Sequence, residues 1–254
     1  MNNIIVEMNG PITEIILNRP DKKNALTPEM YSSISDALIN ANTSDDCKVV
    51  VIRANGDVFC AGNEIAGFAD QSETPQLAET LRFMNSLLDC KKIVIAEVKG
   101  LAVGIGTTML LHCDFVYSCS DTKFIMPFIN LGLVPEYASS YILPLMAGRK
   151  RASEWLLLGE PFGAKEAYEF GMITKVVPAN ELTSTVDKAA GKLASKPAFA
   201  LSRSKALINN QTDLIREQMD TEMDIFIEAM RTEAAREAFD AFLNKRAVDP
   251  EKFK

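Results

Sequence analysis

The chain has 254 residues, 47% of them hydrophobic and 24% charged, which is the composition of a globular protein with a sizeable core. Its formal net charge of −7 disfavours nucleic acid as a partner, because neutralised phosphates supply most of that affinity. No apolar run approaches the ~18 residues of a membrane-spanning helix, so we expect no membrane span.

Cysteine usage and the two ends of the chain bear on location. The five cysteines are odd in number and none has the two-residue spacing of a zinc knuckle, which favours reduced thiols. Residues 1–10 lack the basic region and apolar run of a secretory signal, and the last three residues are not a peroxisomal address. We therefore expect a cytoplasmic protein.

The first 120 residues alternate β-branched runs with helical patterns. Residues 4–6 and 12–17 flank the turn signal Asn9-Gly10-Pro11 and predict a hairpin. Thr27 followed by Pro28 predicts the start of a helix that runs to about residue 42. Strands separated by helices predict an α/β fold built from βαβ units. The other expected strands are 49–52, 93–98 and 115–117, and the other expected helices are 77–88 and 104–111.

The second half has a different pattern. From about residue 140 it is helical, with one strand-like break at 173–177. Between Leu214 and Phe242, apolar residues recur at spacings of three and four, which predicts helices that either pack on the core or form a contact between subunits. The members of this stripe are Met219, Met223, Phe226, Met230, Ala234, Ala238 and Phe242.

Two glycine-bearing turns carry the chemical signal. The first contains Ala61 and Gly62, and the second spans residues 100–106 between a predicted strand and a predicted helix. The glycine spacing of the second turn differs from the dinucleotide fingerprint G-x-G-x-x-G, and no phosphate-loop Lys-Ser/Thr pair follows it. Two such turns, ~40 residues apart, can each offer one backbone N–H to a single oxygen, which is an oxyanion hole.

The order and spacing of these segments resemble the crotonase (enoyl-CoA hydratase/isomerase) superfamily over nearly the whole chain. The resemblance implies an α/β fold, a crotonase-like spiral of ββα units (residues 1–195) with a C-terminal helical oligomerisation region (196–254). It also implies self-association as a trimer or a dimer of trimers. The segments that carry it are Asn18-Arg19-Pro20, Lys23-Asn24-Ala25-Leu26, Phe59-Cys60-Ala61-Gly62, 100–106 and Asp114.

The resemblance also implies how an acyl-CoA substrate binds. The two oxyanion N–H groups should belong to Asn63 and Ile105. Because coenzyme A is part of the substrate, we expect no separate cofactor and no metal. Arg19, Lys22 and Lys23 form either a solvated turn or a contact with the CoA phosphates. The implied substrate-contacting residues are Lys23, Ala25, Ala61, Gly62, Gly104, Phe128, Phe253 and Lys254, the last two from the same or a neighbouring subunit.

Glu136 is the candidate catalytic base. Family hydratases carry two glutamates, at the positions that Thr108 and Phe128 occupy here. Residues 127–141 instead resemble the peroxisomal-type Δ3,Δ2-enoyl-CoA isomerases, in which a glutamate directly after a Val-Pro pair is the base. Glu136 follows such a pair, and without this motif it would be interpreted as an ordinary helix-start carboxylate.

The number of carboxyl groups favours one reaction. Adding water across a double bond usually uses two carboxyl groups, whereas moving a double bond from C3–C4 to C2–C3 needs one group to move a proton. We therefore predict a Δ3,Δ2-enoyl-CoA isomerase of fatty-acid β-oxidation. The alternatives are an enoyl-CoA hydratase or another acyl-CoA reaction on this fold, and a non-catalytic acyl-CoA-binding protein.

The neighbours of these residues lead to three further expectations. Apolar side chains near Glu136 should raise its pKa, although a helix beginning near Tyr137 would act in the opposite direction. His112, the single histidine, lies in an apolar run and is interpreted as a packed residue. Cys60 has no basic partner and is interpreted as an inert buried thiol. Glu64 stands where the isomerase branch usually has aspartate.

Overall fold

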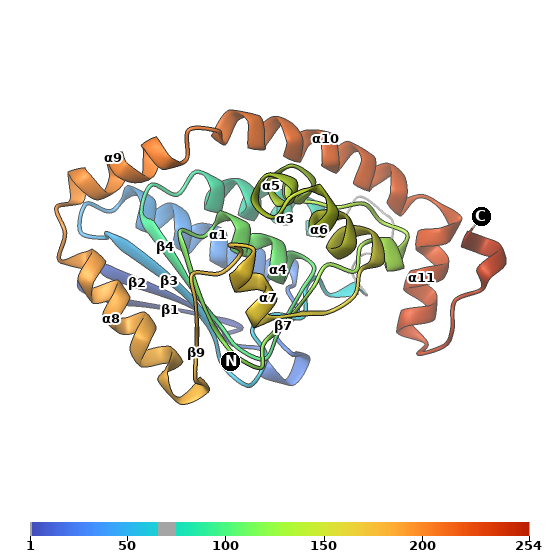
Figure 1. The fold of residues 1–254 in the computed structure, drawn as a ribbon, viewed down its shortest axis with the longest axis horizontal. Coiled ribbons are helices and arrows are strands. Elements are labelled where there is room, and N and C mark those ends of the chain that lie inside the picture. The colour runs from blue at the N-terminus through green and yellow to red at the C-terminus, as the bar shows by residue number, and fades with distance from the viewer. Residues whose placement is uncertain (1, 66–74, 254) are drawn as a thin grey trace.

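The computed structural model describes residues 2–65 and 75–253, and six strands of these residues form one large sheet (Figure 1). The strand order is β1-β2-β3-β4-β6-β9. The first pair is the predicted hairpin and is antiparallel, whereas the other pairs are parallel. The strands are β1 (Ile4–Asn9), β2 (Ile12–Leu17), β3 (Val49–Ala54), β4 (Ile93–Val98), β6 (Phe115–Cys119) and β9 (Lys175–Val177).

Both faces of this sheet are covered. Val50 and Ile52 belong to the main core, which also contains side chains of α1 (Pro28–Thr43) and α3 (Pro75–Leu88). Val49 and Val51 point the other way and pack with side chains of α8 (Leu182–Ala194), which lies on the opposite side of the sheet (Figure 1). Since successive side chains of a strand alternate between faces, a central strand covered on both sides is a continuous apolar run.

A second, smaller layer completes the ββα pattern. Its strands are β5 (Leu101–Val103), β7 (Lys123–Ile125) and β8 (Phe162–Gly163). Isolated parallel bridges join Leu26 to Asn63 and Cys60 to Ala102. After each of the strands β3, β4 and β6 of the large sheet, the chain therefore forms a short extended segment in the smaller layer before the next helix begins. This repetition is the spiral of ββα units that the sequence resemblance implied, although none of these short strands was predicted from periodicity.

The predicted helices are present, with two corrections. Thr27 caps α1, because its side-chain oxygen accepts a hydrogen bond from Met30 N at 3.4 Å. The helix expected at 104–111 is instead a short α4 (Ile105–Thr108) followed by a 3-10 turn, η2 (Met109–His112). Strand β6 begins soon afterwards, at Phe115, and 3-10 turns are common where a short helix ends. The helix expected near Tyr137 begins at Ser139.

The C-terminal half is mostly helical, as predicted, with β8 and β9 as its strands. Of the predicted apolar stripe, Met219, Met223, Phe226 and Met230 are buried in the core, whereas Phe242 is 61% exposed in the single chain, and its contact with another subunit stays a prediction. The division of the chain into a spiral core (1–195) and a helical oligomerisation region (196–254) stays a prediction. The helical elements are α5 (Ser139–Ala147), α6 (Arg149–Ser153), η4 (Glu154–Leu158), α7 (Ala164–Glu169), η5 (Ala179–Glu181), α9 (Ala198–Ile208), α10 (Thr212–Met230), α11 (Glu233–Leu243) and η6 (Pro250–Phe253).

Two kinds of feature are absent from the described part of the chain. No helix there is long and apolar enough to cross a membrane. No group of three or more His, Cys, Asp or Glu side chains there is placed to hold a metal ion.

Candidate active site

The two glycine-bearing turns are in direct contact. Val103 N donates to Cys60 O at 3.0 Å, and Cys60 N donates to Leu101 O at 3.1 Å. A Cβ atom on Gly62 would lie 2.9 Å from Val103 O, and one on Gly106 would lie 2.8 Å from Cys60 O. Glycine is therefore required at both positions by the close approach of the two backbones.

The predicted oxyanion residues line the same cavity, which has a volume of about 650 Å³. Ile105 is the first residue of α4, where a backbone N–H has no acceptor within the helix. Gly104 precedes it with a φ of +53°, a conformation that turns the chain sharply from β5 into the helix. A hydrogen bond fixes the Asn63 side chain: the buried Tyr31 hydroxyl donates to Asn63 Oδ1 at 2.6 Å.

The structure brings most of the predicted contact residues into this one cavity. Phe253 is the exception, because it lies in η6 and is not among the described lining residues. Lys254 lies outside the described residues. The predicted site residues that line the cavity are Lys23, Ala25, Ala61, Gly62, Asn63, Gly104, Ile105, Phe128 and Glu136.

The segment from Lys23 to Leu26 runs beside the first turn. Ala61 N donates to Lys23 O at 3.0 Å, Leu26 N to Gly62 O at 2.8 Å, and Glu64 N to Leu26 O at 3.0 Å. Lys22 and Lys23 line the cavity. Arg19 does not line the cavity. It donates to Glu64 Oε1 at 2.7 Å and so links the Arg19 turn to the first glycine-bearing turn. The glutamate that replaces the usual aspartate thus has a partner in the protein.

Two acidic residues of the described chain line the cavity: Glu64, which is paired with Arg19, and Glu136, which is only 4% exposed. Thr108 Oγ1 donates a hydrogen bond to Glu136 Oε1. Glu136 Oε2 is buried and has no hydrogen-bond partner among the described residues. One carboxylate oxygen is therefore fixed and the other is available to a ligand in the cavity.

Burial dominates the electrostatics of this acid. The pKa of Glu136 is raised to about 8 from an ordinary value near 4.5, chiefly by loss of hydration and to a smaller extent by the carboxylate of Glu222. The hydrogen bond from Thr108 opposes both effects. The direction agrees with the sequence-based expectation, and a carboxyl group with this pKa can both accept and return a proton near neutral pH.

The other titratable candidates have structural roles. His112 Nε2 lies 2.9 Å from Tyr137 O, its ring stacks on the Tyr137 ring at 3.7 Å, and burial lowers its pKa to about 4. Burial raises the pKa of Cys60 to about 12, so this thiol stays protonated. Both residues are packed, as expected.

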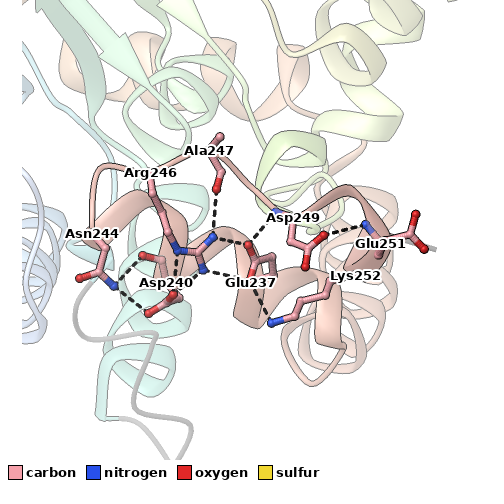
Figure 2. A network of polar contacts seen from close by, with 8 residues as sticks. All are labelled: Glu237, Asp240, Asn244, Arg246, Ala247, Asp249, Glu251 and Lys252. Atoms are coloured by element: carbon pink, nitrogen blue, oxygen red, sulfur yellow. Dashed lines mark hydrogen bonds and ion pairs between the residues drawn. The ribbon is translucent and has the colours of Figure 1, made fainter.

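Residues of α11 and of the segment that follows it line the cavity, and a network of polar contacts holds this segment (Figure 2). Glu237 of α11 accepts hydrogen bonds from Arg246, from Asp249 N at 2.8 Å and from Lys252 Nζ at 3.3 Å. This network folds the chain after α11 back along the helix, and Arg246 then lines the cavity with the exposed Phe242. Three cationic side chains, those of Lys22, Lys23 and Arg246, thus line the cavity of an acidic protein.

Sequence reasoning missed three supporting residues, Thr108 as a hydrogen-bond donor, Tyr31 and Glu222. Glu222 had a visible signal: it lies between Met219 and Met223 on the buried stripe, where a charged side chain is unexpected. The contacts of Thr108 and Tyr31 depend on tertiary packing and had no signal in the sequence.

The ββα spiral, the paired glycine turns and the buried carboxylate together define an enzyme of the crotonase type. The Enoyl-CoA hydratase/isomerase family model matches residues 7–252, and the chain belongs to this family.

Three relatives show the range of reactions in the family. The chain is 33% identical to 1,2-epoxyphenylacetyl-CoA isomerase of Escherichia coli K12 and 34% identical to crotonyl-CoA hydratase of Syntrophomonas wolfei, each over 97% of both proteins. It is 39% identical to enoyl-CoA delta isomerase 2 of Rattus norvegicus over 81% of this chain and 54% of that protein. This chain therefore matches about half the length of the rat protein.

A solved structure matches the whole fold. The enoyl-CoA hydratase/isomerase from Pseudoalteromonas atlantica T6c has a TM-score of 0.92 and 36% identity, covering 98% of this chain and 99% of that one.

Proposed function

We propose that this protein is a Δ3,Δ2-enoyl-CoA isomerase that acts in fatty-acid β-oxidation in the cytoplasm, without a separate cofactor. The observation that carries the proposal is the single buried carboxylate of Glu136, one oxygen of which is unpartnered among the described residues, in the same cavity as Asn63 and Ile105. The similarity to the rat delta isomerase supports it.

The reaction follows from this arrangement. The thioester oxygen of a 3-enoyl-CoA accepts hydrogen bonds from the N–H groups of Asn63 and Ile105. Glu136 removes a proton from C2, and the negative charge moves to the thioester oxygen as an enolate. The electron pair then returns through the conjugated system, and Glu136 delivers a proton to C4, which leaves the double bond between C2 and C3. The apolar wall excludes water from the enolate.

Hydration is the alternative, because a crotonyl-CoA hydratase matches 97% of the chain. The residues around Glu136 argue against it. Thr108 and Phe128 occupy the positions of the two hydratase glutamates, and Thr108 donates its hydrogen bond to Glu136 rather than activating water. A spectrophotometric assay on a series of 3-enoyl-CoA substrates tests the proposal: conjugated 2-enoyl-CoA should form, whereas tight CoA binding without conversion at any chain length would indicate a non-catalytic protein.

The pH dependence of kcat/KM should follow Glu136. Because the base must be ionised and its pKa is raised to about 8, the rate should rise with pH, about tenfold per unit on the acid side, and level off near pH 8. Steady-state kinetics between pH 5 and 9 would measure this. A plateau that begins near pH 4.5 would mean that the substrate-free protein does not hold the proton this tightly.

Gly62→Ala should separate the two oxyanion turns. The added methyl would meet Val103 O at 2.9 Å, and loss of one oxyanion donor typically lowers kcat by ~10²–10³-fold. Gly10→Ala is the matched control, because Gly10 also has a positive φ but nothing lies within 4 Å of an added Cβ. Kinetics and thermal melting of both variants would test this; equal activity in the two would contradict the proposed role of the turn.

We also propose a homotrimer or dimer of trimers. The helices after residue 196 leave large apolar side chains in solvent, including Phe199, Leu207 and Ile208 at 74%, 78% and 78% exposure. Such exposed groups usually mark a contact between subunits. Light scattering coupled to size exclusion should give a multiple of three chains, and a monodisperse monomer would contradict the proposal.

A further inference from the structure

We propose that Glu222 of α10 is a positioning residue that directs the carboxylate of Glu136 into the cavity and modulates its affinity for protons. The inference rests on the proposed role of Glu136 as the base. Glu222 is remote in sequence and does not line the cavity, so it acts through the backbone that follows Glu136.

The backbone after Glu136 adopts an unfavourable conformation. Tyr137 and Ala138 have φ values of 60° and 56°, in the left-handed region that non-glycine residues rarely occupy. Two consecutive residues in this conformation persist only where contacts with the surrounding structure stabilise it. This kink separates Glu136 from α5 and turns its side chain toward Thr108.

Glu222 supplies the contacts that hold the kink. Its Oε2 accepts from Ala138 N at 2.6 Å, and its Oε1 accepts from Ser140 N at 3.0 Å and from Ser140 Oγ. Gln218, one turn earlier on α10, donates to Ser140 Oγ at 3.0 Å. These donors satisfy a carboxylate that is only 4% exposed, and a buried charge persists only when it is hydrogen-bonded in this way.

Glu222 also acts through its charge. Its carboxylate raises the pKa of Glu136, and no basic side chain of the described residues forms an ion pair with it. The other titratable groups around Glu136 stay neutral near pH 7, because burial raises the pKa values of the tyrosines and the thiol and lowers that of the histidine. These groups are Tyr31 on α1, Tyr137, Cys60 in the first turn and His112 on η2.

Two substitutions separate position from charge. Glu222→Gln removes the charge and replaces one acceptor by a donor that faces a backbone N–H. We expect kcat to fall by ~10²-fold, as for a catalytic group displaced by about 1 Å, and the acid limb of kcat/KM to move to lower pH. Glu222→Asp keeps the charge on a shorter side chain, so kcat should fall while the midpoint of the acid limb stays.

A spectroscopic titration completes the test independently of turnover. The ¹³C carboxyl resonance of Glu136, assigned by its loss in Glu136→Gln, should titrate near pH 8 in the unaltered protein and at lower pH in Glu222→Gln. Glu97→Gln is the control, since Glu97 is equally buried but contacts Thr183 and Arg53 on the α8 side of the sheet. An unchanged titration and unchanged kcat in a folded Glu222→Gln protein would overturn the inference. If Glu136→Gln also kept full activity, the proposed role of Glu136 as the base would fail instead, whereas absence of isomerase activity in the unaltered protein would refute the proposed function.

Discussion

Glu136→Gln should lower the rate of double-bond migration by at least ~10²-fold, the usual contribution of a positioned base. Glutamine keeps the size of the side chain and can accept the hydrogen bond from Thr108, but it cannot accept the C2 proton. Affinity for CoA should change little, because the cationic side chains in the cavity lining belong to other segments. Steady-state kinetics on a 3-enoyl-CoA, with CoA binding measured by calorimetry, would check both expectations.

Stability distinguishes this loss from misfolding. The folded protein holds the Glu136 proton more tightly than the unfolded chain, so ionisation costs stability as pH rises from about 4.5 through about 8. The glutamine variant should therefore be at least as stable as the parent at pH 8 and above. Glu97→Gln removes a comparably buried glutamate that also accepts from a threonine, and its activity should stay near that of the parent. Full isomerase activity in Glu136→Gln would require another acid, such as Glu64.

Ile105→Pro should lower kcat by ~10²–10³-fold, because proline deletes one oxyanion donor. Ile105 is the first residue of α4, where proline is sterically favoured. The preceding residue, Gly104, has φ of 53° and ψ of −122°, which lies in the mirror image of the β region that glycine readily adopts. The backbone can therefore stay in place while the N–H is lost.

Ile105→Val is the control for the lost side chain. Ile105 is 1% exposed, so both variants remove buried apolar atoms, but valine keeps the N–H. Valine should cost ~0.5–1.5 kcal/mol of stability and little activity. If the folded proline variant turned over as fast as the valine variant, the enolate oxygen would have to bind elsewhere.

Local signals were sufficient for much of the fold. The hairpin turn at Asn9-Gly10-Pro11 and the cap at Thr27 depend on residues close in sequence, and both are present in the structure. The short strands of the second layer had no such signal. β8 has two residues, and its pairing with β7 depends on chain segments ~40 residues apart, so no window of periodicity could indicate it.

The candidate site divides in the same way. Glu136 and the glycine turns could be named because each belongs to a motif, and the structure gathers them into one cavity. The C-terminal contact could not be predicted well, because the path after α11 is set by the ion pair of Glu237 with Arg246 and by its hydrogen bond from Asp249 N (Figure 2). This network brings Arg246 to the cavity lining and directs Phe253 into η6.

The central claim is that one carboxylate moves a double bond and does not add water. The most direct test is to follow a single 3-enoyl-CoA by NMR in the presence of the protein. The proposed mechanism predicts that 2-trans-enoyl-CoA appears as the first product and that 3-hydroxyacyl-CoA does not accumulate. Formation of 3-hydroxyacyl-CoA at a comparable rate, or persistence of the 3-enoyl-CoA, would contradict it.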